Sequence, residues 1–262
     1  MRPRLVAAPT RYTVSAPGKV PALFETVRPR RLLKTELHAH TNLDPCDAVS
    51  HSTRDLIDRA AALHYQALAI TLHDRYFDAA GDAVYARGRG VTLISGIERT
   101  IGGKHVLLIN FSAACERVQS FSDIAALRAT EPQGLVVAPH PLYPHPSSLG
   151  QRALDEHVHL LDAVEVNAMF TRHINFNRAA MRWARHARKP LVGNSDVHLL
   201  DQLNRTYSLV DAEPSPDAIC EAIRAGRVEV RMQASSLASA AWIFSRMCLG
   251  GAVGRVRRVF KP

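Results

Sequence analysis

From residue 32 onward, short apolar runs typical of β-strands alternate with segments typical of helices. Two helices carry boundary signals: Ser52 and Asp55 form a weakened capping box, and Pro190 ends the helix predicted at 175–188. Alternation without repeats or low-complexity linkers favours one parallel α/β body, most simply a barrel. We predict strands at 32–38, 67–71, 91–97, 105–111, 135–138, 163–166, 191–193 and 207–210, and helices at 52–64, 122–129, 175–188 and 216–225.

The basic charge of the chain is concentrated at its two ends. Residues 1–34 hold eight Lys/Arg and one acid, and residues 246–262 hold five Lys/Arg and no acid. Removing these +7 and +5 from the total of +9 leaves −3 for residues 35–245. The charged ends suggest contact with a polyanion, such as RNA or an anionic membrane surface, with solvated tails as the alternative.

The division of the chain follows from this pattern. We expect an irregular basic N-terminal arm at 1–31, one catalytic domain at 32–231, and an apolar and basic helical tail at 232–262. The four cysteines show no C-x-x-C spacing, and no apolar signal-peptide core follows the basic N-terminus. We therefore expect a cytoplasmic protein. Its tail is expected to dock on the body as a helix, with peripheral membrane contact through residues 237–262 as the alternative.

Two histidines separated by one residue, His38 and His40, end the first predicted strand. Because residues i and i+2 of a strand point to the same face, the pair can offer two imidazole nitrogens to one cation. In an α/β barrel, functional residues lie at the C-terminal ends of strands. Other polar residues follow the same rule: His73, Glu98, His140, Asp196 and His198 end later strands, and His105 opens the fourth.

The types of these side chains indicate the chemistry. Imidazoles and carboxylates without thiolates suit Zn, Mn or Fe in a hydrolytic site. The set is too large for one tetrahedral ion and predicts two or three divalent metal ions that share a bridging carboxylate. Such ions produce hydroxide from bound water near neutral pH and clamp the oxygens of a phosphoryl group. No P-loop, G-x-G-x-x-G or G-x-S-x-G motif competes with this interpretation.

In combination, these motifs resemble the PHP (polymerase and histidinol phosphatase) family over about residues 32–231. His38-Ala39-His40-Thr41 resembles the opening motif, although Glu36 stands where Asp is usual. The later motifs are resembled by Thr71-Leu72-His73-Asp74 (with Leu72 in place of an acid), Gly96-Ile97-Glu98, Pro139-His140-Pro141 and Ser195-Asp196-Val197-His198, and His105 matches the histidine that follows the glutamate. The resemblance implies a distorted (β/α)7 barrel with a trinuclear metal site.

The resemblance also implies a ligand set. Glu98 would bridge two metals. His38, His40 and Asp196 would complete one site, His105 and His140 a second, and Asp47, His73 and His198 a third. The loop 44–47 offers Asp44 as well as Asp47, and Asp47 matches a common variant of the family loop better.

Other polar residues are not expected to bind metal. Arg99, Arg172 and His173 are candidate contacts to substrate oxygens. His51, His145, His157 and His159 are interpreted as loop or surface residues, and His64 and His186 as residues near helix C-termini, where the helix dipole favours a cation.

The predicted function is a metal-dependent phosphoesterase that hydrolyses phosphate monoesters of a small molecule or nucleotide through a metal-bound hydroxide. No stable protein partner is predicted. The first alternative is an amidohydrolase-type C–N hydrolase, which also opens with H-x-H. The second is a non-catalytic barrel that binds RNA or membrane through its basic termini.

Overall fold

The computed structural model describes residues 31–243, 245 and 246. The strands are β1 (Leu32–Glu36), β2 (Ala67–Ala69), β3 (Thr92–Ile94), β4 (Gly96–Ile101), β5 (Lys104–Ile109), β6 (Leu135–Ala138), β7 (Ala163–Asn167), β8 (Leu191–Asn194), β9 (Thr206–Asp211) and β10 (Val228–Met232). The helices are α1 (Thr53–Ala62), α2 (Ala83–Gly88), α3 (Phe121–Thr130), α4 (Gly150–Glu156), α5 (Asn177–His186) and α6 (Pro216–Arg224). Short 3-10 turns occupy Ala79–Gly81, Ala113–Arg117 and Leu200–Gln202.

The strands form two five-stranded sheets, in the orders β10-β9-β1-β2-β3 and β4-β5-β6-β7-β8. The pairs β1–β2, β2–β3, β6–β7 and β7–β8 are parallel, whereas β1–β9, β9–β10, β4–β5 and β5–β6 are antiparallel. The α/β class is therefore confirmed, but the prediction of a wholly parallel body is wrong. The ladders of the described residues form two open sheets and do not by themselves show the predicted closed (β/α)7 barrel.

The largest departure from the predicted elements is a β-hairpin. The run 91–97 was expected to be one strand, but it divides at Ser95 into β3 and β4, which belong to different sheets. β4 turns into β5 through Gly102 and Gly103, whose φ angles are +56° and +76°. Two consecutive glycines between two strands of alternating apolar and polar residues are a strong signal for a β-hairpin. The two-residue turn of such a hairpin needs positive φ angles, which glycine adopts readily. Glu98 consequently lies within a hairpin strand and not at the end of a parallel strand.

Backbone bridges join the segments that follow β1 and β2 to the second sheet and the segment that follows it. Ala39, after β1, pairs in parallel with Val197, after β8, and His73 pairs with Glu98. The first bridge is fastened by hydrogen bonds from His40 N to the Val197 carbonyl (2.9 Å) and from Val197 N to the His38 carbonyl (3.0 Å). The bridge therefore sets the His-x-His and Asp-x-His segments side by side.

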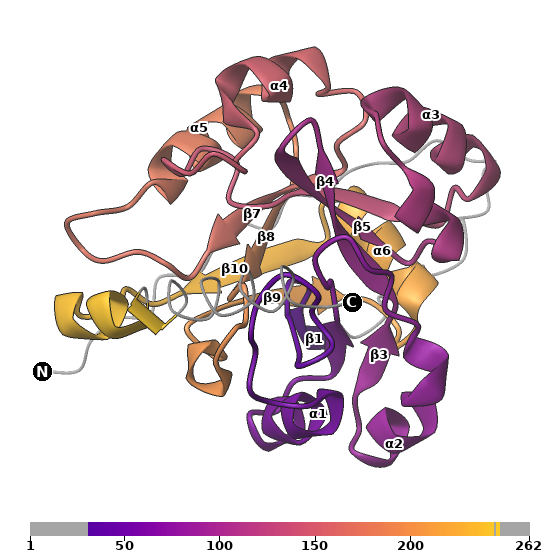
Figure 1. The fold of residues 1–262 in the computed structure, drawn as a ribbon, viewed down its shortest axis with the longest axis vertical. Helices are drawn as coiled ribbons and strands as arrows, with labels where there is room; N and C mark the ends of the chain where they lie inside the picture. The colour runs from indigo at the N-terminus through magenta and orange to yellow at the C-terminus, as the bar shows by residue number, and fades with distance from the viewer. Residues whose placement is uncertain (1–30, 244, 247–262) are drawn as a thin grey trace, which may run out of the picture.

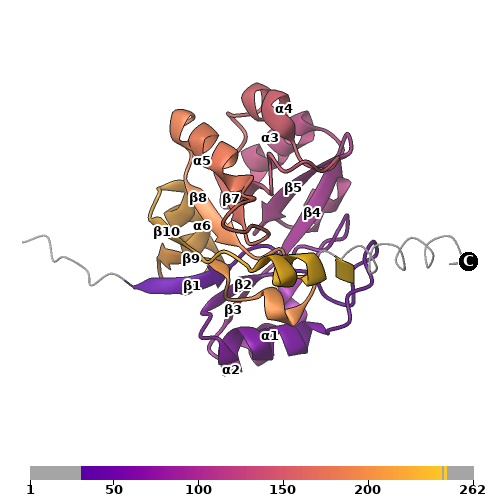
Figure 2. The ribbon, with the colours of Figure 1, turned by 90° about the vertical axis from the view of Figure 1, so that its left-hand side faces the viewer.

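The core is built from both sheets. One buried cluster combines side chains of the two sheets with α6, including Leu33, Ile94, Leu107, Val137 and Val192. Helices α3, α4 and α5 lie over the second sheet and α1 and α2 over the first, as Figures 1 and 2 show. The predicted capping box of α1 is confirmed, because Ser52 and Asp55 exchange side-chain and backbone hydrogen bonds.

The described part of the predicted C-terminal tail contacts the body. Ser235 forms a bridge with Thr171, and Ile243, in the helical stretch 237–243, is 4% exposed. None of the helices in the described ranges is long and apolar enough to cross a membrane. The basic arm at 1–30 and the basic residues after 246 lie outside the described residues, so the prediction of a polyanion at the termini is not tested.

Candidate metal centre

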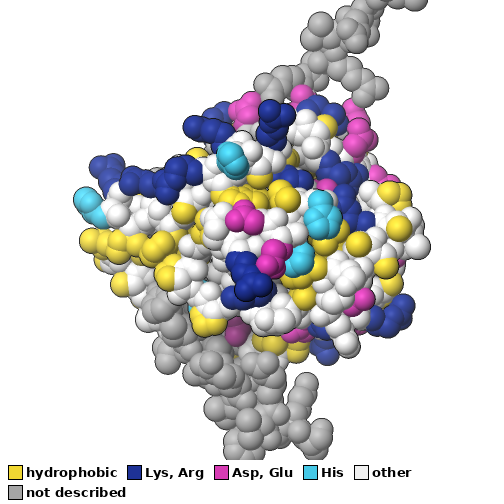
Figure 3. Space-filling model, turned by 90° about the horizontal axis from the view of Figure 1, so that it is seen from above, with side chains coloured by type: hydrophobic (Ala, Val, Ile, Leu, Met, Phe, Trp, Pro, Cys, Tyr) yellow, Lys and Arg dark blue, Asp and Glu magenta, His cyan; other side chains and the backbone are white. Residues whose placement is uncertain are grey.

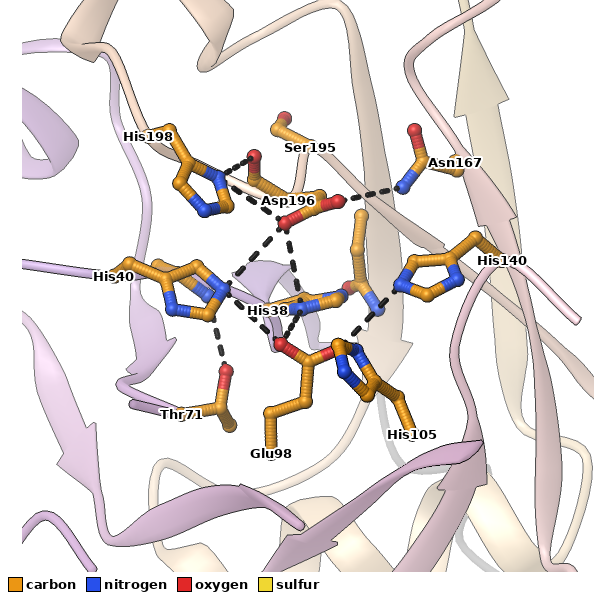
Figure 4. A network of polar contacts seen from close by, with 12 residues as sticks. His38, His40, Thr71, Glu98, His105, His140, Asn167, Ser195, Asp196 and His198 are labelled. Atoms are coloured by element: carbon orange, nitrogen blue, oxygen red, sulfur yellow. Dashed lines mark hydrogen bonds and ion pairs between the residues drawn. The ribbon is translucent and has the colours of Figure 1, made fainter. Parts of the chain in front are cut away.

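His38 and His40 converge on one small volume with two carboxylates (Figure 4). The His38 Nε2 atom lies 3.3 Å from Glu98 Oε2 and 3.4 Å from Asp196 Oδ1, and the corresponding distances for His40 Nε2 are 3.4 and 3.5 Å. Both Nε2 atoms are buried, and neither has a hydrogen-bond partner among the described residues. Leaving such polar atoms unpaired is costly. Tetrahedral ligands about 2.1 Å from a metal stand roughly 3.4 Å apart, so the four atoms fit the first predicted metal group.

The outer nitrogens of the two imidazoles are held by buried carboxylates. His38 Nδ1 donates to Glu165 Oε2 at 2.8 Å, and His40 Nδ1 donates to Asp44 Oδ2 at 2.8 Å. Each bond places the ring proton on Nδ1 and leaves Nε2 as the free ligand atom. The sequence interpretation did not identify Glu165. Its signal was a strand, 163–167, in which only Glu165 and Asn167 are polar.

Glu98 divides its two oxygens between two groups of histidines. Its Oε2 atom faces His38, His40 and His73, the last at 3.1 Å, whereas Oε1 lies 2.6 Å from His105 Nδ1 and 3.4 Å from His140 Nε2. This is the arrangement expected of a bridging carboxylate. Burial opposes the charge of Glu98, but the surrounding His105, His38 and His73 outweigh it and hold the pKa of Glu98 well below its usual range.

Of the third predicted group (Asp47, His73 and His198), only Asp47 and His198 contact each other directly. Asp47 Oδ2 lies 3.0 Å from His198 Nε2, whereas His73 turns its Nδ1 to Asp44 at 3.0 Å and its Nε2 to Glu98. The arrangement also brings His73 and His198 together with His40, whose ring stacks on both of theirs. All nine predicted ligands nevertheless belong to one connected cluster.

The loop 44–47 separates the roles of its two aspartates. Asp44 is buried, and its oxygens accept hydrogen bonds from the side chains of His40 and His73 and from the backbone of His73, Cys46 and Asp47. Asp47 instead directs its carboxylate at His198, and its side chain is 26% exposed. Asp44 thus contacts two histidines of the cluster, His40 and His73, whereas Asp47 contacts His198.

Burial and neighbouring charges shift the pKa values of side chains in and beside the cluster. Burial opposes the protonated form of His73, yet Glu98 and Asp44 outweigh it and raise the pKa of His73 to about 9. Burial raises the pKa of Glu36, the residue that replaces the usual Asp, to about 8. The Glu36 carboxylate accepts hydrogen bonds from the backbone of Ser195 and His38 and so ties β1 to the Asp196 segment.

The candidate substrate contacts lie away from the ligand atoms. Arg99 follows Glu98 in β4, so it projects to the opposite face, where its guanidinium contacts the Asp74 carboxylate at 2.6 Å and the Val118 carbonyl. Arg172 and His173 are exposed and line a hollow of about 390 Å³ with residues 234–237. The cluster itself opens on one side, because the side chains of His73, His105, His140 and Asp196 are 12–16% exposed.

One histidine interpreted as a loop or surface residue has a structural role. His51 is 5% exposed, and its Nε2 donates to the carbonyl of His40 at 2.8 Å. His51 lies in a loop, as predicted, but it is buried and not at the surface, because the 44–51 loop folds back over the H-x-H segment. The Asn42 N–H also bonds to the His51 carbonyl, which closes this loop.

Comparisons with known proteins give one family-model match and several similar folds. Residues 175–228 match the family model described as PHP-associated. The fold is similar to that of a two-domain protein from Bacteroides vulgatus ATCC 8482 that contains a predicted PHP-like metal-dependent phosphoesterase, with TM-score 0.58 and 19% identity over 78% of this chain. These findings confirm the resemblance to the PHP family. No curated protein matches the sequence.

Two further solved structures share the fold. The lesion-specific endonuclease PfuEndoQ from Pyrococcus furiosus has TM-score 0.54 and 17% identity over 76% of this chain. An amidohydrolase from Chromobacterium violaceum has TM-score 0.50 and 17% identity over 63% of this chain and 87% of its own. This chain spans 66% of the length of the Bacteroides protein and 58% of the Pyrococcus enzyme. At these identities the likeness establishes the fold alone.

Proposed function

We propose that this protein is a metal-dependent phosphoesterase that hydrolyses phosphate monoesters of a small molecule or nucleotide. The observation that carries the proposal is the pair of buried, unpartnered Nε2 atoms of His38 and His40, aimed at Glu98 and Asp196. Divalent ions held there would activate water and neutralise charge on phosphate oxygens. The PHP-associated match and the PHP-like fold support this class of reaction.

In the proposed site, the nine predicted ligands hold two or three ions, with Mn, Zn or Fe as candidates. Glu98 contributes one oxygen to each of two groups, and Glu165 and Asp44 keep His38 and His40 in the ligating tautomer. Residues from both sheets share one core, which supports treating the two sheets as halves of a distorted barrel with the site at its mouth.

The test measures bound metal and phosphatase activity together. The full chain is purified, its metal content is determined by mass spectrometry, and hydrolysis of p-nitrophenyl phosphate is followed with added Mn, Zn or Fe. We expect bound metal and activity in the wild type and loss of both in His38→Ala. His159→Ala is the matched control, because His159 is exposed. Protein that binds no metal and stays inactive with all three ions would refute the proposal.

The same assay, extended to amides and lactams, distinguishes the phosphoesterase from the amidohydrolase alternative. The similar fold of the Chromobacterium amidohydrolase is the reason to test that alternative. Both classes can use a metal cluster of this composition, so the substrate must decide. The phosphoesterase proposal predicts turnover of phosphate esters and none of amides or lactams. Turnover of amides or lactams without any turnover of phosphate esters would favour the alternative.

A further inference from the structure

A segment of the body carries an unusual concentration of positive charge. Residues 35–245 contain 20 Lys/Arg and 23 Asp/Glu, a net charge of −3. Residues 168–189 contain six of those Lys/Arg and none of the acids, so this segment carries +6 and the rest of the body −9. Five of the six are arginines: Arg172, Arg178, Arg182, Arg185 and Arg188. We call these five residues the α5 basic surface.

The arginines are displayed on a rigid support. Arg178, Arg182 and Arg185 recur at i, i+4 and i+7, so they share one exposed face of α5. The opposite face is anchored by Ala180, Trp183 and Ala184, which are buried, and the Trp183 indole donates to Asp155 at 2.7 Å. No ion pair between described residues includes any member of the α5 basic surface. Their charges are therefore available to a ligand.

One end of this surface adjoins the metal cluster. Asn177, the first residue of α5, exchanges two hydrogen bonds of 2.9 Å with the backbone of Asn167. The Asn167 amide in turn lies 3.5 Å from Asp196 Oδ2 and donates to Glu165. From this end, α5 extends about 15 Å at 1.5 Å per residue. Figure 3 views the molecule from above Figure 1, where α5 lies near the top, and shows a row of Lys and Arg side chains at one edge with hydrophobic side chains beside it.

An exposed aromatic residue lies where the surface meets the site. Phe176 is 38% exposed, and its ring packs 5.4 Å from that of Tyr143, whose N–H bonds to the His140 carbonyl. Arginines that fork onto phosphates, next to an exposed aromatic ring on which a base can stack, are the features of single-strand nucleic-acid binding. An anionic membrane is the competing ligand, because Ile174 and Leu237 are exposed nearby, but the large apolar residue Trp183 of α5 is buried on the face opposite the arginines.

We propose that the α5 basic surface binds single-stranded nucleic acid, with the phosphodiester backbone along Arg178, Arg182 and Arg185 and one end of the strand at the metal cluster. Binding by the arginines stands by itself, whereas delivery of the strand to the cluster rests on the proposed function. The site is distinct from the basic termini, because it is built from the folded body.

The test measures binding of a fluorescein-labelled oligothymidylate to the full chain by fluorescence anisotropy, in EDTA and over a series of salt concentrations. The variant R182Q/R185Q removes two charges and retains helix-forming side chains. We expect roughly ten-fold weaker binding at low salt and a salt slope lower by about 1.4, since each phosphate contact on a single strand contributes about 0.7. R87Q/R117Q, which removes two exposed arginines elsewhere, is the matched control and should bind like the wild type.

Activity is read separately on p-nitrophenyl phosphate. Equal turnover by the wild type and R182Q/R185Q, together with the binding loss, supports the proposal. Absence of turnover in both would refute the proposed function while leaving the binding result intact. Equal affinity of R182Q/R185Q and the wild type, or an equal loss in the control, would overturn the inference. The inference would also be overturned if the wild type did not bind the oligonucleotide but pelleted with phosphatidylserine vesicles, and R182Q/R185Q did not pellet with them.

Discussion

Glu165 accepts a hydrogen bond from Nδ1 of His38 at 2.8 Å, and both side chains are completely buried. The same carboxylate accepts hydrogen bonds from the amides of Asn194 and Asn167 and from the backbone of His140. A single residue of β7 thus orients a histidine after β1 and supports another after β6. This relationship makes Glu165 the clearest supporting residue of the candidate metal centre.

Replacing Glu165 with Gln should weaken metal binding by roughly 10- to 100-fold, the usual effect of losing a carboxylate that orients a metal-bound histidine. The Gln amide can no longer hold the Nδ1 proton of His38 as an anionic acceptor does. Competition with a metallochromic chelator measures the affinity. Glu156→Gln, on an exposed helix end, serves as the control. Unchanged affinity in Glu165→Gln would contradict the role.

The two aspartates of the 44–47 loop should respond differently to amide substitution. Asp44→Asn should lower the stability of the metal-free protein by about 2–3 kcal/mol, because Asp44 is buried and bonds to His40 and His73. Asp47→Asn should leave that stability nearly unchanged but reduce the number of ions bound. Urea unfolding in EDTA and metal analysis of loaded protein measure the two effects. Reversed results would exchange the roles of the two residues.

The stability of the metal-free protein should fall as the pH rises through about 9. The pKa of His73 is raised to about 9 in the fold, against an unfolded value of about 6.5. A raised folded pKa contributes stability that is fully present below the unfolded pKa and is lost as the pH passes the folded pKa. Melting temperatures of the protein in EDTA, recorded at pH values from about 6.5 to about 9, measure this loss. In His73→Gln the melting temperature should depend less on pH. An unchanged dependence in that variant would mean that groups other than His73 cause the effect.

Gly193 allows β8 to approach β9 closely, and Gly193→Ala should destabilise the protein by about 1–3 kcal/mol. A Cβ at this position would lie 2.8 Å from the Tyr207 carbonyl oxygen and 2.9 Å from Val230 Cγ1. The strand must then shift, and it leads directly to Asp196. Urea unfolding provides the measurement. Gly81→Ala is the matched control, because its Cβ would meet nothing within 4 Å. Equal effects of both substitutions would refute the packing argument.

The predicted strands were largely recovered, because buried apolar runs with polar ends are local patterns. The run 135–138 coincides with β6, and α1 begins at the predicted Ser52 cap. The missed elements are β10, α2, α4 and the separate strand β4. The first three are short or only partly buried, so their apolar signal is weak. β4 merged with the preceding apolar run, although Gly102 and Gly103 marked the hairpin.

The sequence by itself determined the types of the candidate ligands and most of their positions. His38, His40, Glu98 and Asp196 can be read from short motifs, because a strand's alternation places i and i+2 on one face. Only the tertiary structure decided which atoms meet. The Ala39–Val197 bridge, the division of Glu98 between two histidine groups and the support from Glu165 join residues as far apart as 158 positions. Such contacts depend on sheet pairing and burial across the whole chain, which no local pattern encodes.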